Sequence, residues 1–178
     1  MKKNLLVYLY GATIILQGVF LLFSKHFTFN ATKYILGIAV IIGAILALVT
    51  AFARQRKHVQ FAYHEMHALA MFVYGISVLV FANTVEVLSY LTAFLLFFYA
   101  FSEVIFCNWL FNLGNKVKLK ILFIRVVLGI MVGIGTIVLM NYYTVNKSIV
   151  MGGYGILFAI IGLNILLYQP IMKVLNEP

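Results

Sequence analysis

Six apolar segments follow one another along the chain, and short polar stretches separate them. Each segment has about 20 residues, which is the length that an α-helix needs to cross ~30 Å of hydrocarbon. The pattern predicts an all-α, polytopic membrane protein with six transmembrane helices. We place these helices at residues 4–23, 33–53, 60–82, 85–107, 121–140 and 148–168.

The links between these segments lead to further predictions. Residues 82–84 join the third and fourth segments, so these two helices should form a tight hairpin. The longest link is expected at residues 108–120, where Trp109 would lie in an interfacial turn. Aromatic side chains at helix ends anchor helices among the lipid headgroups. We expect this role for three tyrosines: Tyr142, Tyr143 and Tyr168.

The basic residues are divided unequally between the two sides of the membrane that this topology creates. With a cytoplasmic N-terminus, ten of the thirteen Lys and Arg residues fall on the cytoplasmic side. The ten are Lys2, Lys3, Arg54, Arg56, Lys57, Lys116, Lys118, Lys120, Arg125 and Lys173. Lys25, Lys33 and Lys147 fall on the other side. Because short loops rich in Lys and Arg stay in the cytoplasm, we expect both termini to be cytoplasmic.

The composition agrees with this assignment, because 65% of the 178 residues are hydrophobic. The helices occupy nearly the whole chain, so we expect one transmembrane domain over residues 1–178. A net charge of +9 would suggest nucleic-acid binding in a soluble protein. Here the basic residues sit in short loops that contact anionic headgroups, so the expected partners are membrane lipids and no nucleic acid. The single cysteine, Cys107, excludes an intrachain disulfide and a CxxC motif.

The six segments also read as three tandem helical hairpins, at about residues 4–58, 59–115 and 116–170. Small residues recur along them, and in lipid such residues let helices approach closely. Gly129 and Gly133, for example, form a GxxxG motif. We expect seven glycines at helix contacts: Gly18, Gly37, Gly43, Gly129, Gly133, Gly155 and Gly162. Packing inside the bundle is the favoured interpretation, and a homo-oligomer stays open.

Three glycine-containing stretches carry a resemblance to a known family. They are Gly18 with Val19 to Phe23, Ile35-Leu36-Gly37 with Ile41-Ile42-Gly43, and Gly155 with Ile160-Ile161-Gly162. In this pattern, its length and its hairpin repeat, the chain resembles the HdeD-type acid-resistance membrane proteins. The resemblance implies a multi-pass protein of the bacterial inner (plasma) membrane, tied to acid or envelope stress and without a settled biochemical activity.

Four predicted helices carry polar side chains at a similar depth, where ionisable groups are costly. At 1.5 Å per residue they lie in one layer of the cytoplasmic leaflet, roughly 6–10 Å from its surface. The layer consists of His64, Glu65, His67, Glu103, Arg125 and Asn164. Glu103 and Arg125 are the expected pair, because they lie on consecutive antiparallel helices. Three roles stay open for them: a structural clamp, separate snorkelling to the interface, and transport of protons or solute.

The two histidines of this layer permit two further interpretations. His64 and His67 share a helix face and could sense pH, or they could share a metal with Glu103. Their spacing is not HExxH, and no second predicted helix carries a histidine, so we expect no metal and no cofactor. The chain has no Asp, no Ser-His-Asp arrangement and no phosphate loop, so we expect no enzymatic activity. The sequence favours a non-enzymatic membrane bundle, with a small proton or solute conduit as the alternative.

Overall fold

A computed structural model describes residues 2–53, 63–112, 119–144, 146–169 and 171. They form α1 (Lys2–Leu22), the short 3-10 helix η1 (Ser24–His26), α2 (Phe29–Ala53), α3 (Tyr63–Phe81), α4 (Val85–Asn112), α5 (Leu119–Tyr142) and α6 (Lys147–Leu166). All six α-helices are long and apolar enough to cross a membrane. The prediction of an all-α, multi-pass membrane protein with six transmembrane helices is confirmed.

The predicted and observed helices differ most at the C-terminal end of α4. The helix continues to Asn112, so the expected link at residues 108–120 begins later than predicted, and Trp109 is helical. Leu110 is fully buried, and the Trp109 ring stacks on Phe106 with 6.1 Å between the ring centroids. This packing gives the last turns of α4 a buried face and extends the helix. Residues 113–118 of the predicted link lie outside the described residues.

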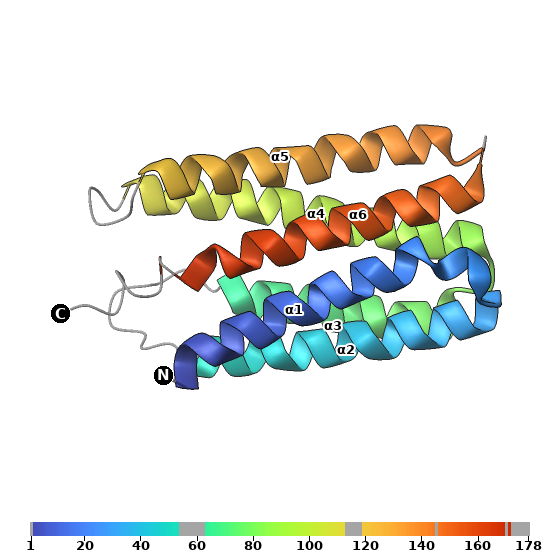
Figure 1. The fold of residues 1–178 in the computed structure, drawn as a ribbon, viewed down its shortest axis with the longest axis horizontal. Coiled ribbons are helices and arrows are strands. Elements are labelled where there is room, and N and C mark those ends of the chain that lie inside the picture. The colour runs from blue at the N-terminus through green and yellow to red at the C-terminus, as the bar shows by residue number, and fades with distance from the viewer. Residues whose placement is uncertain (1, 54–62, 113–118, 145, 170, 172–178) are drawn as a thin grey trace.

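The six helices lie side by side and run in alternating directions along the long axis of the molecule (Figure 1). They form a closed ring in chain order, because each α-helix packs against the next and α6 packs against α1. The start of α1 and the end of α6 lie at the same end of the bundle, which we refer to as the terminal end. We refer to the opposite end, which holds η1, as the loop end.

The most extensive packing joins different hairpins, not the two helices of one hairpin. α1 packs most extensively against α6, and α2 against α3. α3 ends at Phe81 and α4 begins at Val85, so residues 82–84 join the third and fourth helices as predicted. Within the described residues, these two helices pack less extensively than the other neighbouring pairs. The bulky side chains of Phe94 and Phe98 line a groove of about 480 Å³ between these two helices. Side chains still join the two helices, for example Tyr74 and Thr92, whose hydroxyl oxygens lie 2.8 Å apart.

Glycines occupy the close crossing of α1 and α6. A Cβ atom added to Gly155 would lie 2.5 Å from the carbonyl oxygen of Gly18. Seven residues further along α6, a Cβ atom on Gly162 would lie 2.7 Å from the carbonyl oxygen of Gly11. Because lipid gives helices no hydrophobic reason to associate, such close backbone packing is what holds membrane helices together. The first and third hairpins are joined in this way.

The remaining predicted glycines also lie at helix contacts. A Cβ atom on Gly37 would lie 2.7 Å from a methyl group of Leu79 on α3. On α5, a Cβ atom on Gly129 would lie 3.1 Å from Cγ of Glu103. A Cβ atom added to Gly43 would lie 2.6 Å from its nearest neighbour, and one added to Gly133 would lie 3.4 Å from its nearest neighbour. Near Gly43, the buried Gln17 donates a hydrogen bond of 2.7 Å to the carbonyl oxygen of Ala39, which ties α1 to α2.

Three helices begin at the loop end with a polar capping residue. Side-chain oxygens of Thr28, Thr84 and Asn146 accept hydrogen bonds of 3.0–3.3 Å from backbone N–H groups in the first turns of α2, α4 and α6. Such caps satisfy N–H groups that have no partner within the helix and stabilise the helix start. The second helix of every hairpin therefore begins, capped, at the loop end.

Candidate functional site

An ion pair between α4 and α5 lies at the centre of the predicted polar layer. Arg125 Nε donates to Glu103 Oε1 at 2.7 Å, and Arg125 Nη2 donates to Glu103 Oε2 at 2.9 Å. Neither side chain is exposed at all, so neither snorkels to the interface. Two parallel hydrogen bonds between a guanidinium and a carboxylate combine charge attraction with a fixed geometry. The pair therefore fixes both the depth and the rotation of α5 relative to α4.

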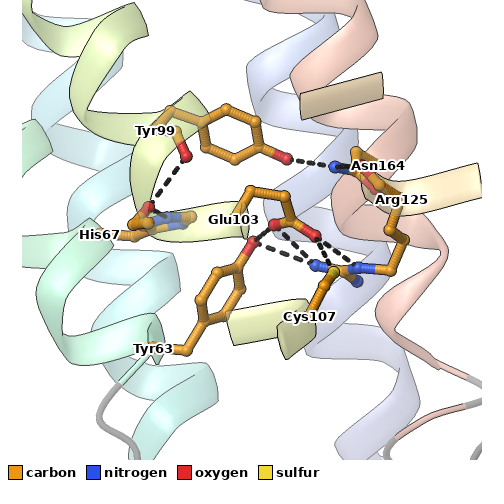
Figure 2. A network of polar contacts seen from close by, with 8 residues as sticks. Tyr63, His67, Tyr99, Glu103, Cys107, Arg125 and Asn164 are labelled. Carbon is orange, nitrogen blue, oxygen red and sulfur yellow. Dashed lines mark hydrogen bonds and ion pairs between the residues drawn. The ribbon is translucent and has the colours of Figure 1, made fainter. Parts of the chain in front are cut away.

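Tyr63, in the first turn of α3, completes a triangle with this pair. Its hydroxyl group donates a hydrogen bond to Glu103 Oε2 and accepts one of 3.0 Å from Arg125 Nη2. Figure 2 shows the Tyr63 ring reaching from α3 to the carboxylate, where dashed lines join its hydroxyl group to both Glu103 and Arg125. A single cluster of hydrogen bonds thus ties α3, α4 and α5 together.

Aromatic rings enclose the guanidinium group. Arg125 Cζ lies 5.6 Å from the ring centroid of Tyr63, 5.5 Å from that of Phe106 and 5.6 Å from that of Tyr168. Attraction between a cation and aromatic faces stabilises a desolvated charge. This compensation matters because Arg125 Nη1 makes no hydrogen bond within the described part of the chain.

Tyr168 is one of three tyrosines that we expected among the headgroups, and for Tyr168 the prediction was wrong. It is fully buried, since its ring packs against Arg125 and Phe106 instead. Tyr142 is 57% exposed, whereas Tyr143 is only 9% exposed. Position at a helix end did not by itself show which of these rings face outward.

Asn164 extends the cluster to α6. Its side-chain Nδ2 donates hydrogen bonds to the Tyr99 hydroxyl group at 2.7 Å and to the backbone oxygen of Arg125 at 3.4 Å. On α4, the Cys107 thiol donates a hydrogen bond of 3.3 Å to Glu103 Oε1. We use the term clamp network for the residues joined in this way: Tyr63, Tyr99, Glu103, Cys107, Arg125 and Asn164. The network spans four of the six helices.

His67 lies beside the clamp network, toward the middle of the bundle. Its Nε2 atom is 2.8 Å from Ser102 Oγ, and Ser102 Oγ donates its hydrogen to the backbone oxygen of Tyr99 at 2.9 Å. Because a hydroxyl group has one hydrogen to give, this arrangement makes His67 Nε2 the donor to Ser102. The histidine therefore carries a hydrogen on Nε2 in this geometry.

A small internal cavity adjoins His67. It has a volume of about 20 Å³, which is room for about one water molecule. Tyr10 and Tyr99 also line it, together with apolar side chains of four helices. The space beside His67 is therefore too small for a larger solute.

His64 and Glu65 complete the predicted layer. His64 is fully buried, and its ring meets those of Tyr63 and Tyr168 edge to face, at 5.2 Å and 4.4 Å between the centroids. Glu65 lies in the first turn of α3 and, unlike the clamp network, is only half-buried. Within the described residues, His, Cys, Asp and Glu side chains form no group of three or more that could hold a metal ion.

Four contributing residues were not predicted as members of the site: Tyr63, Tyr99, Ser102 and Cys107. Spacing along α4 holds a signal for two of them, because Tyr99 and Cys107 lie four residues before and four residues after Glu103. Residues four apart share one face of a helix. Tyr63 stands in the same relation to His67. A search for polar side chains one turn from each buried ionisable residue would have found these three.

The Tyr63 hydroxyl group should contribute measurably to stability. Replacing Tyr63 with phenylalanine keeps the ring over Arg125 but removes the hydroxyl group. The buried atoms Glu103 Oε2 and Arg125 Nη2 then each lose one hydrogen-bond partner. We expect the free energy of unfolding to fall by about 1–3 kcal/mol. Equilibrium unfolding of the purified protein in mixed micelles measures this change. Tyr90→Phe is the matched control, because Tyr90 is 54% exposed and should tolerate the same change. Equal stability of both variants would contradict the assigned role.

Comparison with known proteins adds one match. Residues 9–82 match the model of a family described as a short repeat of unknown function (DUF308). The matched stretch covers most of α1, all of α2 and all of α3, and so includes Tyr63 and His67 but not Glu103 or Arg125. No curated protein and no solved structure matches the chain. The protein is therefore a multi-span membrane protein that contains a stretch similar to the DUF308 short repeat.

Proposed function

We propose that the protein is a non-enzymatic scaffold of the bacterial inner membrane that acts in resistance to acid or envelope stress. The observation that carries the scaffold role is the fully buried Glu103–Arg125 pair, which aromatic rings enclose. A charge pair in such surroundings is suited to fixing helices in place, because each partner is held by the other and by fixed neighbours. The stress role rests on the resemblance to the HdeD-type proteins.

We further propose that the terminal end faces the cytoplasm and that membrane lipids are the protein's partners. The excess of Lys and Arg that the sequence assigns to the cytoplasmic side supports both points. A homo-oligomer is compatible with the many large apolar side chains on the outer surface of the helices, although lipid covers such surfaces equally well.

The alternative function is a small conduit for protons or solute. One observation favours it: the cavity of about 20 Å³ lies beside His67, and histidine is a residue type found in the proton relays of membrane proteins. A conduit would need a continuous path from this cavity to both membrane surfaces. The clamp network would lie between the cavity and the membrane surface at the terminal end.

Proton flux distinguishes the two functions. The protein is reconstituted in liposomes that contain a pH-sensitive dye, and the outside is acidified. For a scaffold, we expect the dye to respond at the same rate as in empty liposomes, both for the wild type and for Glu103→Gln. Flux above that of empty liposomes that disappears in Glu103→Gln would contradict the scaffold and make Glu103 part of a proton path.

Survival after an acid shock tests the stress role separately. Cells that lack the protein should survive less well than the same cells carrying the wild-type gene, and expression of Arg125→Met should restore less survival because fewer molecules fold. Equal survival with and without the gene would refute the stress role and leave the scaffold itself untouched.

A further inference from the structure

At the loop end, a pocket of about 300 Å³ opens between three helices. It is lined by η1 and the segment that follows it, and by the first turns of α2, α4 and α6. Each of these helices has 20 residues or more. The repeat of hairpins explains this arrangement, because the second helix of each hairpin begins at the loop end. Three helix starts therefore meet around one pocket.

Helix starts carry partial positive charge. The aligned peptide dipoles of a long helix act as about half an elementary charge at its N-terminus. This charge, together with N–H groups that point outward along the helix axis, makes such ends favourable for anions. The starts of α2, α4 and α6 border the pocket, and each is stabilised by its capping residue. First-turn N–H groups of all three helices already donate to the caps, and α1 ends beside the pocket, so the backbone adds less positive charge than three free helix starts would.

Two lysines add full positive charges to the same lining. Lys25, in η1, and Lys147, in the first turn of α6, both line the pocket and are exposed. The Lys147 ammonium group lies 5.6 Å from the centroid of the Tyr143 ring. Among the described residues, Glu86 is the carboxylate in the first turn of α4, and it is not part of the lining. Positive charge in the lining is therefore not neutralised by a lining carboxylate.

The lining also offers hydrogen-bonding side chains and apolar surface. Ser24, Thr32 and Ser148 belong to it, and Thr32 is only 5% exposed although it is polar. Side chains of Phe27, Phe29, Val85, Leu88 and Met151 form the apolar part. An anionic group attached to hydrocarbon would fit this combination, because the charged part would meet the lysines and the apolar part the aromatic and aliphatic side chains.

We propose that this pocket binds a phosphate group, with Lys25 and Lys147 as its cationic contacts and the starts of α2, α4 and α6 as its dipolar contacts. The phosphate has two sources, the headgroup of an anionic phospholipid and free phosphate. The site lies at the opposite end of the bundle from the clamp network, and its existence does not depend on the proposed scaffold function.

Binding to the full-length protein in an uncharged detergent tests the proposal. One arm titrates a short-chain phosphatidylglycerol, and the other titrates inorganic phosphate at constant ionic strength. We expect saturable binding in at least one arm, and about a fivefold increase in Kd for each of Lys25→Gln and Lys147→Gln, because each exposed lysine contributes one screened charge contact. Binding in the lipid arm alone identifies the headgroup as the source, and binding in the phosphate arm identifies free phosphate.

Lys120→Gln is the matched control, because Lys120 is an exposed lysine at the terminal end, near the start of α5. It removes the same charge from the protein and should leave the Kd unchanged. Melting temperatures without ligand should agree among all three variants, since the three lysines are exposed. Absence of saturable binding in both arms, or an equal increase in Kd for Lys120→Gln, would overturn the proposal.

Discussion

Replacing Arg125 with methionine should lower the free energy of unfolding by about 3–5 kcal/mol, the largest effect that we expect from a single substitution. The change leaves the Glu103 carboxylate buried, next to the Tyr63 hydroxyl group and the Cys107 thiol but without a cation. An isolated charge in a low-dielectric interior is far more costly than a paired one. Equilibrium unfolding in mixed micelles, or the melting temperature in a mild detergent, measures the loss.

The double variant Glu103→Leu with Arg125→Met separates the cost of a stranded charge from the value of the pair. Apolar side chains of similar volume often replace a buried ion pair at little cost. We therefore expect the double variant to regain most of the lost stability. Two results would contradict the clamp: Arg125→Met as stable as the wild type, or a double variant no more stable than Arg125→Met alone.

Replacing Gly155 with alanine should destabilise the protein by about 1–3 kcal/mol, although alanine is the better helix former. The added Cβ atom would lie 2.5 Å from the carbonyl oxygen of Gly18 and 2.9 Å from the backbone nitrogen of Leu22. Both neighbours are backbone atoms and cannot rotate away. α1 and α6 must then move apart along their crossing, and unfolding measurements will register the lost packing.

Gly152→Ala provides a control on the same helix. No atom lies within 4 Å of a Cβ built on Gly152, so the substitution meets open space. Here the helix propensity of alanine should dominate and stabilise the protein by up to about 1 kcal/mol. If the two substitutions change the free energy of unfolding in opposite directions, the close contact with α1 lies at Gly155 and not at Gly152, three residues away. A loss at Gly152 equal to that at Gly155 would show that the effect is not due to the crossing.

Local sequence patterns were enough to predict the membrane-spanning helices. Length and continuous apolar character identify each helix. The end of α4 was harder to predict, because Asn108 and Asn112 look like loop residues. The packing of Leu110 and Trp109 outweighs that local preference.

The site was predictable only in part, because its charges and its aromatic enclosure follow different rules. Glu103 and Arg125 are conspicuous in an apolar chain, and their depth alone suggested that they would meet. Tyr168 was not predictable in the same way, since a tyrosine at a helix end suits a headgroup as well as a buried cation. Which role it takes depends on how α6 packs against α3 and α4, and that packing is a property of the whole ring.

Closure of the ring by α1 and α6 has a consequence for the order of biosynthesis. Gly11 and Gly18 acquire their neighbours only when α6 has been made, and about 125 residues separate the end of α1 from the start of α6. At a synthesis rate of about 5–20 residues per second, α1 waits on the order of ten seconds with this face open. A nascent chain interrupted before α6 thus presents an unfilled glycine groove, by which membrane quality control could recognise it as unfinished.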